Sequence, residues 1–169
     1  MIFLTIGSHE PFDRLVETID NWCVSRKYGD RVFGQITDHA GYLPTAFPSV
    51  AMLDPDEYRD RCRQADLVVS HAGMGSIITA MSVQTPILVM PRRGHLGETR
   101  NDHQYATAIR FRKCSGVYVA MDEVELPSML DALLTSDTLS SGSAISPFAQ
   151  AQLIETLRAF VFEHSSPGS

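Results

Sequence analysis

The sequence predicts an α/β fold in which a parallel sheet carries helices on both faces. Two observations predict it: short apolar, β-prone runs alternate with segments whose apolar residues recur at helical spacing, and polar or glycine-rich turns separate them. Strands that alternate with helices form βαβ units, which build parallel sheets. The 169 residues fit a single domain. We expect this domain to span residues 1–163, with a disordered tail over residues 164–169.

The first half of the chain begins with a β-prone run over residues 2–6. A helix pattern follows, with apolar side chains at Phe12, Leu15, Val16, Ile19, Trp22 and Cys23. Further strands are predicted over residues 31–37 and 50–53. Asp54 is typical of an N-cap and Pro55 of the first helical position, so the next helix is predicted from there to about Gln64.

The second half continues the alternation, with strands predicted over residues 67–70, 86–90 and 117–119. A helix of about ten residues is predicted from Ser76, and residues 101–112 are helical in composition. Two apolar stripes predict later helices, one at Leu126, Met129, Leu130, Leu133 and Leu134, and one at Leu153, Ile154, Leu157, Phe160 and Val161. We expect the last helix, residues 148–162, to pack on the sheet, and the Ser/Thr-rich residues 135–146 to form an exposed loop.

Composition and charge exclude several classes of protein. With 44% hydrophobic and 20% charged residues, the chain is neither disordered nor fibrous. No apolar run reaches the length of about 18 residues that a transmembrane helix needs, and the N-terminus lacks the features of a signal peptide. The net charge of −6 argues against a nucleic-acid partner. Three cysteines without a CxxC spacing indicate a reducing cytoplasm and no structural metal.

The strongest candidate site is the turn over residues 70–76, between a buried strand and a helix. Ligands of open α/β sheets bind outside the carboxyl ends of strands. Gly73 and Gly75 allow close approach to the backbone, and free N–H groups at a helix start suit a phosphate. Ser76 would cap the helix or bond a phosphate oxygen, and His71 would donate to a diphosphate. The alternative is a glycine turn that serves only strand–helix packing.

A second candidate site follows the next strand, over residues 91–98 and 101–104. Asp102, His103 and Gln104 supply the donors and acceptors that neutral sugar hydroxyls need. Between Arg92 and Lys113 there are six basic and two acidic residues, a local charge of +4 that favours an anionic ligand. Arg93, like Arg92, is a candidate for a phosphate or a carboxylate. The alternative, favoured for the basic residues after residue 109, is a solvated face.

A third candidate site follows the first strand, at Gly7, Ser8, His9 and Glu10. His9 would serve as a general base, because the ordinary pKa of histidine lies near neutrality, with Glu10 or Asp13 orienting it. The alternative is that Ser8 and Glu10 cap the helix and that His9 is exposed to solvent.

Other chemistries lack support in the sequence. The six histidines form no HxxxH or HExxH pattern, so metal catalysis is not indicated. Gly73-Met74-Gly75 does not continue to a third dinucleotide-binding glycine, because Ile78 stands there. P-loop and G-x-S-x-G motifs are absent. The cysteines have no activating neighbours in sequence and are interpreted as structural.

The three segments together resemble one known family. Residues 5–16 (TIGSHEPFDRLV), 65–76 (ADLVVSHAGMGS) and 91–104 (PRRGHLGETRNDHQ) are similar to bacterial exopolysaccharide glycosyltransferases of the two-component type. These belong to the GT-B enzymes of the family 28 C-terminal-domain type, as does the catalytic subunit of the dolichol-pathway N-acetylglucosamine transferase. The order and spacing hold from residue 1 to about residue 112.

The resemblance implies half of a GT-B fold, a single Rossmann-like domain that holds a UDP-sugar. It implies inverting transfer without a metal or cofactor, to a lipid-linked saccharide acceptor. A membrane-anchored second subunit would supply the other Rossmann domain and keep this chain in the cytoplasm, peripheral to the inner face of the cell membrane. We expect an obligate partner, because a GT-B cleft needs two such domains and 169 residues supply one.

The resemblance also implies roles for individual residues. It assigns His71, Gly73, Gly75 and Ser76 to the diphosphate, and Asp102, His103 and Gln104 to the sugar hydroxyls, with Gly7 and Ser8 near the phosphates. We expect the catalytic residues to be His9 and His71. The expected UDP-sugar contacts are Gly7, Ser8, Gly73, Met74, Gly75, Ser76, Thr79, Arg92, Glu98, Asp102, His103 and Gln104.

One position departs from the family. Thr79 stands eight residues after His71, where the family usually has a Glu that bonds the ribose hydroxyls. Loss of a charge-assisted contact would reduce donor affinity roughly tenfold. Two alternatives therefore stay open: a non-catalytic subunit that binds UDP-sugar or stabilises its partner, and a free-standing hydrolase or epimerase of nucleotide sugars.

Overall fold

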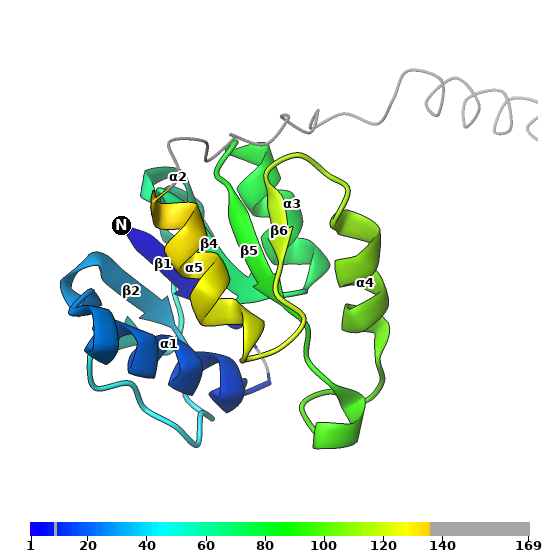
Figure 1. The fold of residues 1–169 in the computed structure, drawn as a ribbon, viewed down its shortest axis with the longest axis horizontal. Helices are drawn as coiled ribbons and strands as arrows, with labels where there is room; N and C mark the ends of the chain where they lie inside the picture. Colours follow the sequence, from blue (N-terminus) through cyan, green and yellow to red (C-terminus); the bar gives the residue numbers. More distant parts are fainter. Residues whose placement is uncertain (9, 136–169) are drawn as a thin grey trace, which may run out of the picture.

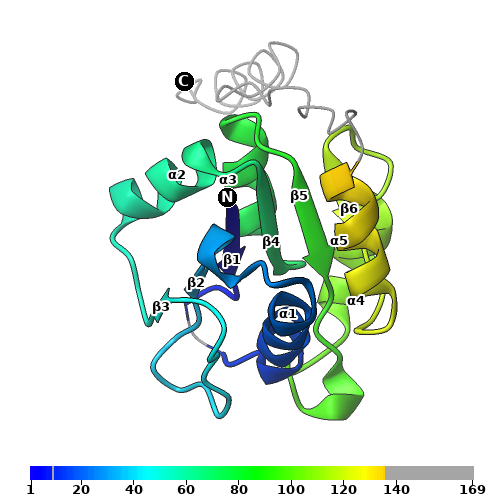
Figure 2. The ribbon, with the colours of Figure 1, turned by 60° about the vertical axis from the view of Figure 1, so that its left-hand side comes forward.

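A six-stranded parallel sheet forms the centre of the fold in the computed structural model, which describes residues 1–8 and 10–135 (Figure 1). The strands are β1 (Ile2–Thr5), β2 (Val32–Gln35), β3 (Ser49–Val50), β4 (Leu67–His71), β5 (Ile87–Met90) and β6 (Val117–Val119). They lie in the order β3-β2-β1-β4-β5-β6, which Figure 2 shows from one edge to the other. All neighbouring pairs are parallel. The chain reverses its direction of progress between β1 and β4, the position at which such sheets bind ligands.

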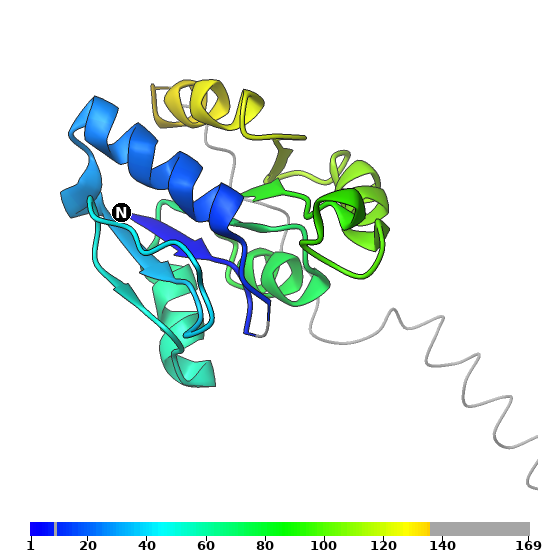
Figure 3. The same ribbon diagram turned by 90° about the horizontal axis from the view of Figure 1, so that it is seen from below.

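Helices cover both faces of the sheet, as the sequence predicts. The helices are α1 (Asp13–Arg26), α2 (Pro55–Gln64), α3 (Met74–Ser82), α4 (His103–Phe111) and α5 (Glu125–Thr135), with 3₁₀ turns η1 (Gly29–Arg31) and η2 (Gly94–Leu96). Figure 3 shows α1 and α5 on one side of the sheet and α2 and α3 on the other. Ala108 of α4 packs in the same core layer as the residues of α2 and α3. The predicted fold class is confirmed.

Alternate strand residues enter two separate core layers. In β1, Ile2 and Leu4 pack with the residues of α1 and α5, whereas Phe3 packs with those of α2 and α3. In β5, Leu88 packs in the layer of α1 and α5, and Ile87 packs in the layer of α2 and α3. These side chains are almost fully buried, and each contributes about 1.5–3 kcal/mol by leaving water. Burial on both faces explains why the central strands are continuous apolar runs in the sequence.

The predicted N-cap at Asp54 is confirmed, because its carboxylate accepts hydrogen bonds from the N–H groups of Asp56 and Glu57. The alternative that Ser8 or Glu10 caps α1 is wrong: the N-cap position is Phe12, which makes no side-chain cap.

Several predicted boundaries differ from the structure. The third strand ends at Val50, not at residue 53, because the N–H of Leu53 donates to the Gln35 side chain instead of continuing the ladder. Helix α3 begins at Met74, before the predicted Ser76, because the carbonyl of Gly73 already accepts from Ile77. Helix α4 begins two residues after position 101, since Asn101 and Asp102 bond other groups.

Other sequence-based expectations concern segments outside the described residues. These are the rest of the Ser/Thr-rich loop after Thr135, the final helix over residues 148–162 and the tail over residues 164–169, so the domain bounds of 1–163 stay a prediction. Within residues 1–8 and 10–135, no helix is both long and apolar enough to cross a membrane. The three cysteines are free thiols, two of them buried.

Candidate functional site

A pocket of about 470 Å³ opens at the carboxyl ends of β1 and β4, where the strand order reverses. Its position follows the rule for ligand sites in open α/β sheets. The pocket unites residues from all three candidate segments of the sequence. Its lining comprises Ile6, Gly7, Ser8, Glu10, Gln35, Tyr58, His71, Gly75, Ser76, Thr79, Arg92 and Gln104.

The imidazole of His71 lies between two glycines in the floor of this pocket. A Cβ on Gly73 would lie 2.1 Å from Nε2 of His71, and a Cβ on Gly7 would lie 3.0 Å from Cε1. Gly7 also has a φ of +87°, which disfavours any other residue. A Cβ on Gly75 would meet nothing within 4 Å, and this glycine is open to the pocket. Two of the predicted glycines thus make room for the histidine, and the third leaves room for a ligand.

His71 is uncharged at neutral pH. Burial lowers its pKa to about 4, and the positive charge of Arg92 lowers it further, whereas a backbone hydrogen bond at Thr5 acts in the opposite direction. Its Nδ1 lies 3.2 Å from the hydroxyl of Ser70, which fixes the ring. His71 can therefore take part in hydrogen bonding at the pocket, but it supplies no positive charge near pH 7.

The start of α3 presents backbone N–H groups to the pocket. Its N-cap, Gly73, has no side chain that would accept from them, so they remain available to an anion. The expectation that Ser76 caps this helix is wrong, because Ser76 lies inside the first turn and its Oγ accepts from the hydroxyl of Tyr58 at 3.1 Å. Thr79 follows one turn later and also lines the pocket.

Arg92 supplies the positive charge of the pocket. Its side chain is only 3% exposed and lies 5.0 Å above the ring of Phe12. Nη2 donates to the carbonyl oxygens of Ile6, at 2.8 Å, and Glu10, at 2.5 Å, whereas Nε is buried without a partner. Among the described residues, no carboxylate forms an ion pair with this guanidinium. Burial lowers the pKa of Arg92, although Glu10 and Glu98 act in the opposite direction.

Of the three consecutive residues predicted to bind the sugar, Asp102, His103 and Gln104, only Gln104 lines the pocket. Gln104 is buried, and its Oε1 accepts from the backbone N–H of Arg92 at 3.2 Å. Asp102 is exposed and accepts from the N–H of Gly94 at 2.8 Å. His103 contacts the side chain of Asn101. Each of these three side chains therefore has a hydrogen-bond partner within the protein.

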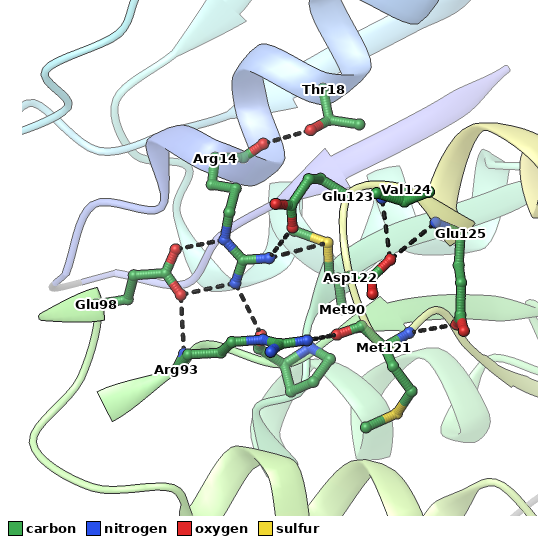
Figure 4. A network of polar contacts seen from close by, with 11 residues as sticks. Arg14, Thr18, Met90, Arg93, Glu98, Met121, Asp122, Glu123, Val124 and Glu125 are labelled. Atoms are coloured by element: carbon green, nitrogen blue, oxygen red, sulfur yellow. Dashed lines mark hydrogen bonds and ion pairs between the residues drawn. The ribbon is translucent and has the colours of Figure 1, made fainter. Parts of the chain in front are cut away.

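Glu98 does not line this pocket, because its carboxylate is bound elsewhere, and its predicted contact with a UDP-sugar stays a prediction. Its carboxylate pairs with Arg14, which comes from helix α1 (Figure 4). Arg93 is also turned away from the pocket, since its Nη2 donates to the carbonyl of Met121. Of the six basic residues between Arg92 and Lys113, Arg92 alone is part of the described pocket lining.

The other residues predicted to contact the ligand differ in their position relative to the pocket. Gly7 and Ser8 line the pocket, whereas Met74 is not part of its lining and is 47% exposed. His9 lies outside the described residues, so its proposed role as a base stays a prediction.

Sequence reasoning missed Tyr58 and Gln35 in the pocket. Gln35 stands at the carboxyl end of β2, and its amide donates to the carbonyl of Gly7 at 3.3 Å. The rule that selected the other three loops applies to this strand end as well and was sufficient to find it. Tyr58 reaches the pocket from the middle of α2, and no local pattern marks it. Residues 1–8 and 10–135 contain no group of three or more His, Cys, Asp or Glu side chains arranged to hold a metal.

Comparison with solved structures supports the fold. The structure of an anthocyanidin 3-O-glucosyltransferase in complex with UDP matches with a TM-score of 0.65 at 13% identity, over 97% of this chain and 40% of that one. The glycotransferase of kitacinnamycin matches with a TM-score of 0.60 at 19% identity, over 98% and 40%. The solution structure of ALG13 matches with a TM-score of 0.58 at 20% identity, over 92% and 93%. The chain thus spans about two fifths of the first two proteins.

A search of curated proteins finds no match. The family model described as the glycosyltransferase family 28 C-terminal domain matches residues 1–155. Its match covers all three segments that line the pocket, and the similar structures share the half-domain of the GT-B fold. The chain therefore belongs to the glycosyltransferase family 28 C-terminal domain family.

Proposed function

We propose that this chain binds a UDP-sugar in the pocket between β1 and β4 and transfers the sugar to a lipid-linked saccharide acceptor. The transfer would invert the anomeric configuration and serve exopolysaccharide or capsule synthesis. A membrane-anchored partner subunit would complete the cleft, and this chain would act at the inner face of the membrane through that partner. Family membership and the pocket support the donor site, and the resemblance of the sequence supports the remainder.

The observation that carries the proposal is the buried guanidinium of Arg92 beside the open start of α3. A buried charge without an ion-pair partner is costly, and an anionic ligand would offset that cost. Backbone N–H groups at a helix start bind phosphates without any side chain. The two features line one pocket, whose size suits a nucleotide-sized ligand.

The start of α3 and the guanidinium of Arg92 would also stabilise the charge that develops during the reaction. The acceptor oxygen attacks the anomeric carbon as the bond from that carbon to the diphosphate oxygen breaks, and the acceptor proton passes to a base. Negative charge grows on the leaving diphosphate, where the N–H groups of α3 and the guanidinium of Arg92 would stabilise it. His71 would contribute as a neutral hydrogen-bonding group. The base would be His9 or a group of the partner.

The proposal is tested by binding and by transfer. Calorimetry with UDP on the full chain, alone and with the partner, should show binding that Arg92→Met weakens by at least about tenfold. Co-expression with the membrane-associated product of a neighbouring gene, followed by a screen of UDP-sugars against a lipid-linked acceptor, should show transfer. Absence of UDP binding in both settings would sink the proposal.

The second candidate is a UDP-sugar-binding subunit that performs no chemistry. It is favoured by the titratable groups of the described pocket, because the pKa of His71 is lowered to about 4 and Thr79 supplies no carboxylate. This candidate predicts UDP binding with unchanged transfer in the His71→Ala and His9→Ala variants of the complete complex. A hydrolase or epimerase would instead turn over UDP-sugar with no acceptor present.

A further inference from the structure

The backbone on both sides of Arg92 is held by two side chains outside the pocket. On one side, Nη2 of Arg14 donates to the carbonyl oxygen of Pro91 at 3.3 Å. On the other side, the N–H of Arg93 donates to Oε2 of Glu98 at 2.8 Å. Figure 4 shows these contacts converging from α1 and from the loop after β5. Hydrogen bonds to Arg14 and Glu98 thus hold the backbone on both sides of Arg92.

Arg14 and Glu98 also hold each other in a two-pronged ion pair. Nε of Arg14 lies 2.7 Å from Oε1 of Glu98, and Nη2 lies 2.7 Å from Oε2. The two side chains are 15% and 13% exposed, so water screens this pair less than a surface pair. Paired planar groups of this kind fix orientation as well as distance.

A third contact of Arg14 reaches a different loop. Its Nη1 lies 2.7 Å from Oε2 of Glu123, which precedes α5 and is 47% exposed. Glu123 makes no described contact with the backbone beside Arg92, whereas Glu98 does. The chain therefore offers two glutamates that pair with the same arginine, only one of which touches the segment that carries Arg92.

We propose that Arg14 and Glu98 are positioning residues that aim the guanidinium of Arg92 into the pocket. For its effect on ligand binding, the inference rests on the proposed function of that pocket. Arg92 has its own side-chain bonds to the loop after β1, and its N–H donates to Gln104, but the peptides on either side of it are held by Arg14 and Glu98. Sub-ångström placement of a charged donor decides how well it binds an anion. Glu98, expected from the sequence to touch the ligand, would act instead through Arg92.

The test compares Glu98→Ala with Glu123→Ala in the full chain. Both variants remove one carboxylate from Arg14. Calorimetry with UDP should show about a tenfold loss of affinity for Glu98→Ala, but less than about a twofold loss for Glu123→Ala. Glu98→Gln retains one oxygen for the N–H of Arg93 and should recover part of the loss. Thermal unfolding of each variant measures stability separately.

Coupling to Arg92 separates positioning from general damage. In an Arg92→Met background, Glu98→Ala should cause no further loss of UDP affinity, although it should still lower the melting temperature. A loss of the same factor in both backgrounds would overturn the inference, and so would equal losses for Glu98→Ala and Glu123→Ala.

A spectroscopic measurement keeps this test independent of the proposed function. The Nε–H signal of Arg92, assigned by its absence in Arg92→Lys, should move or broaden in Glu98→Ala and stay in place in Glu123→Ala. If the unmodified chain binds no UDP but this signal responds as expected, the proposed function fails and the positioning role stands. An unmoved signal in Glu98→Ala would contradict the positioning role.

Discussion

The imidazole of His71 occupies the space that a side chain on Gly73 would need. A Cβ on Gly73 would lie 2.1 Å from Nε2 of His71, far inside van der Waals contact. The backbone of Gly73 has a negative φ of −85°, so its lack of a side chain is required by the imidazole and not by its conformation. The glycine turn therefore serves the histidine directly.

Gly73→Ala should displace the imidazole of His71 and destabilise the protein by about 1–3 kcal/mol, because the well-packed floor of the pocket must shift. Gly75→Ala is the matched control, since a Cβ there meets nothing within 4 Å. In the first turns of α3, alanine should be neutral or stabilising by up to about 1 kcal/mol. Urea unfolding measures both values, and equal stabilities of the two variants would contradict the packing argument.

The lowered pKa of His71 should make stability depend on pH. The folded protein holds this pKa at about 4, against an ordinary value of 6.5. Between those values the unfolded chain binds a proton that the folded chain does not, so stability is full above pH 6.5 and falls as the pH is lowered toward 4. The loss should be on the order of 3 kcal/mol.

Urea unfolding at a series of pH values between 7 and 4 measures this loss, compared with His71→Asn, which cannot titrate. The variant should show a much flatter profile above pH 5, where carboxylates contribute little. If both proteins lost stability in parallel as the pH falls, groups other than His71 would be responsible for the pH dependence.

Arg92→Lys should weaken UDP binding by about tenfold or more while it retains the charge. The guanidinium donates to the carbonyl oxygens of Ile6 and Glu10 and still faces the pocket, and an ammonium group cannot reproduce that planar geometry. Arg26→Lys is the control, because Arg26 forms an exposed pair with Asp131 far from the pocket. Calorimetry with UDP should leave this control unchanged, and a similar loss in both would refute the assignment.

Asp20→Asn should destabilise the protein by about 2–3 kcal/mol. The buried carboxylate of Asp20 accepts hydrogen bonds from the hydroxyl of Tyr42, from the N–H and hydroxyl of Thr45 and from the N–H of Ala46. These bonds hold the chain between β2 and β3, and an amide would turn a donor toward some of them. Asp60→Asn removes an exposed pair with Arg63 and should cost less than about 0.5 kcal/mol. Urea unfolding compares the two variants.

The sequence predicts this fold well because each central strand is buried on both faces and is a continuous apolar run. Residues 67–70, for example, lie within β4. Prediction fails where a side chain replaces the regular backbone pattern. The third strand ends early because Gln35 accepts from Leu53, and nothing in residues 50–53 reveals that distant partner.

The same distinction between local and distant partners applies to the candidate site. Positions at strand ends, such as Gly7 and Arg92, can be placed at one edge of the sheet from local sequence, because parallel strands bring their carboxyl ends together. The pairing of Glu98 could not be predicted, because its partner, Arg14, stands 84 positions earlier in the chain. A motif shows that a residue is polar and close to a site, but not which distant side chain already occupies it.

Thr79 provides a test of ribose recognition in the proposed donor pocket. Thr79 lines the pocket, and its hydroxyl can offer at most one neutral bond to a ribose diol. The unmodified chain should therefore bind UDP and 2′-deoxy-UDP with affinities within about fivefold of each other. Thr79→Glu would introduce a carboxylate able to accept from both hydroxyls and should widen the preference for UDP by about tenfold.

Thr79→Gln is the matched control for that change, because it has the length of glutamate without the charge. Calorimetry with both nucleotides gives the ratio of affinities for each variant, which cancels any general damage to the pocket. A preference that widens equally in the Gln and Glu variants would show that side-chain length, not the carboxylate, governs the contact. A preference unchanged in both would place the ribose away from α3, since a carboxylate within reach of the diol must distinguish it from the deoxy sugar.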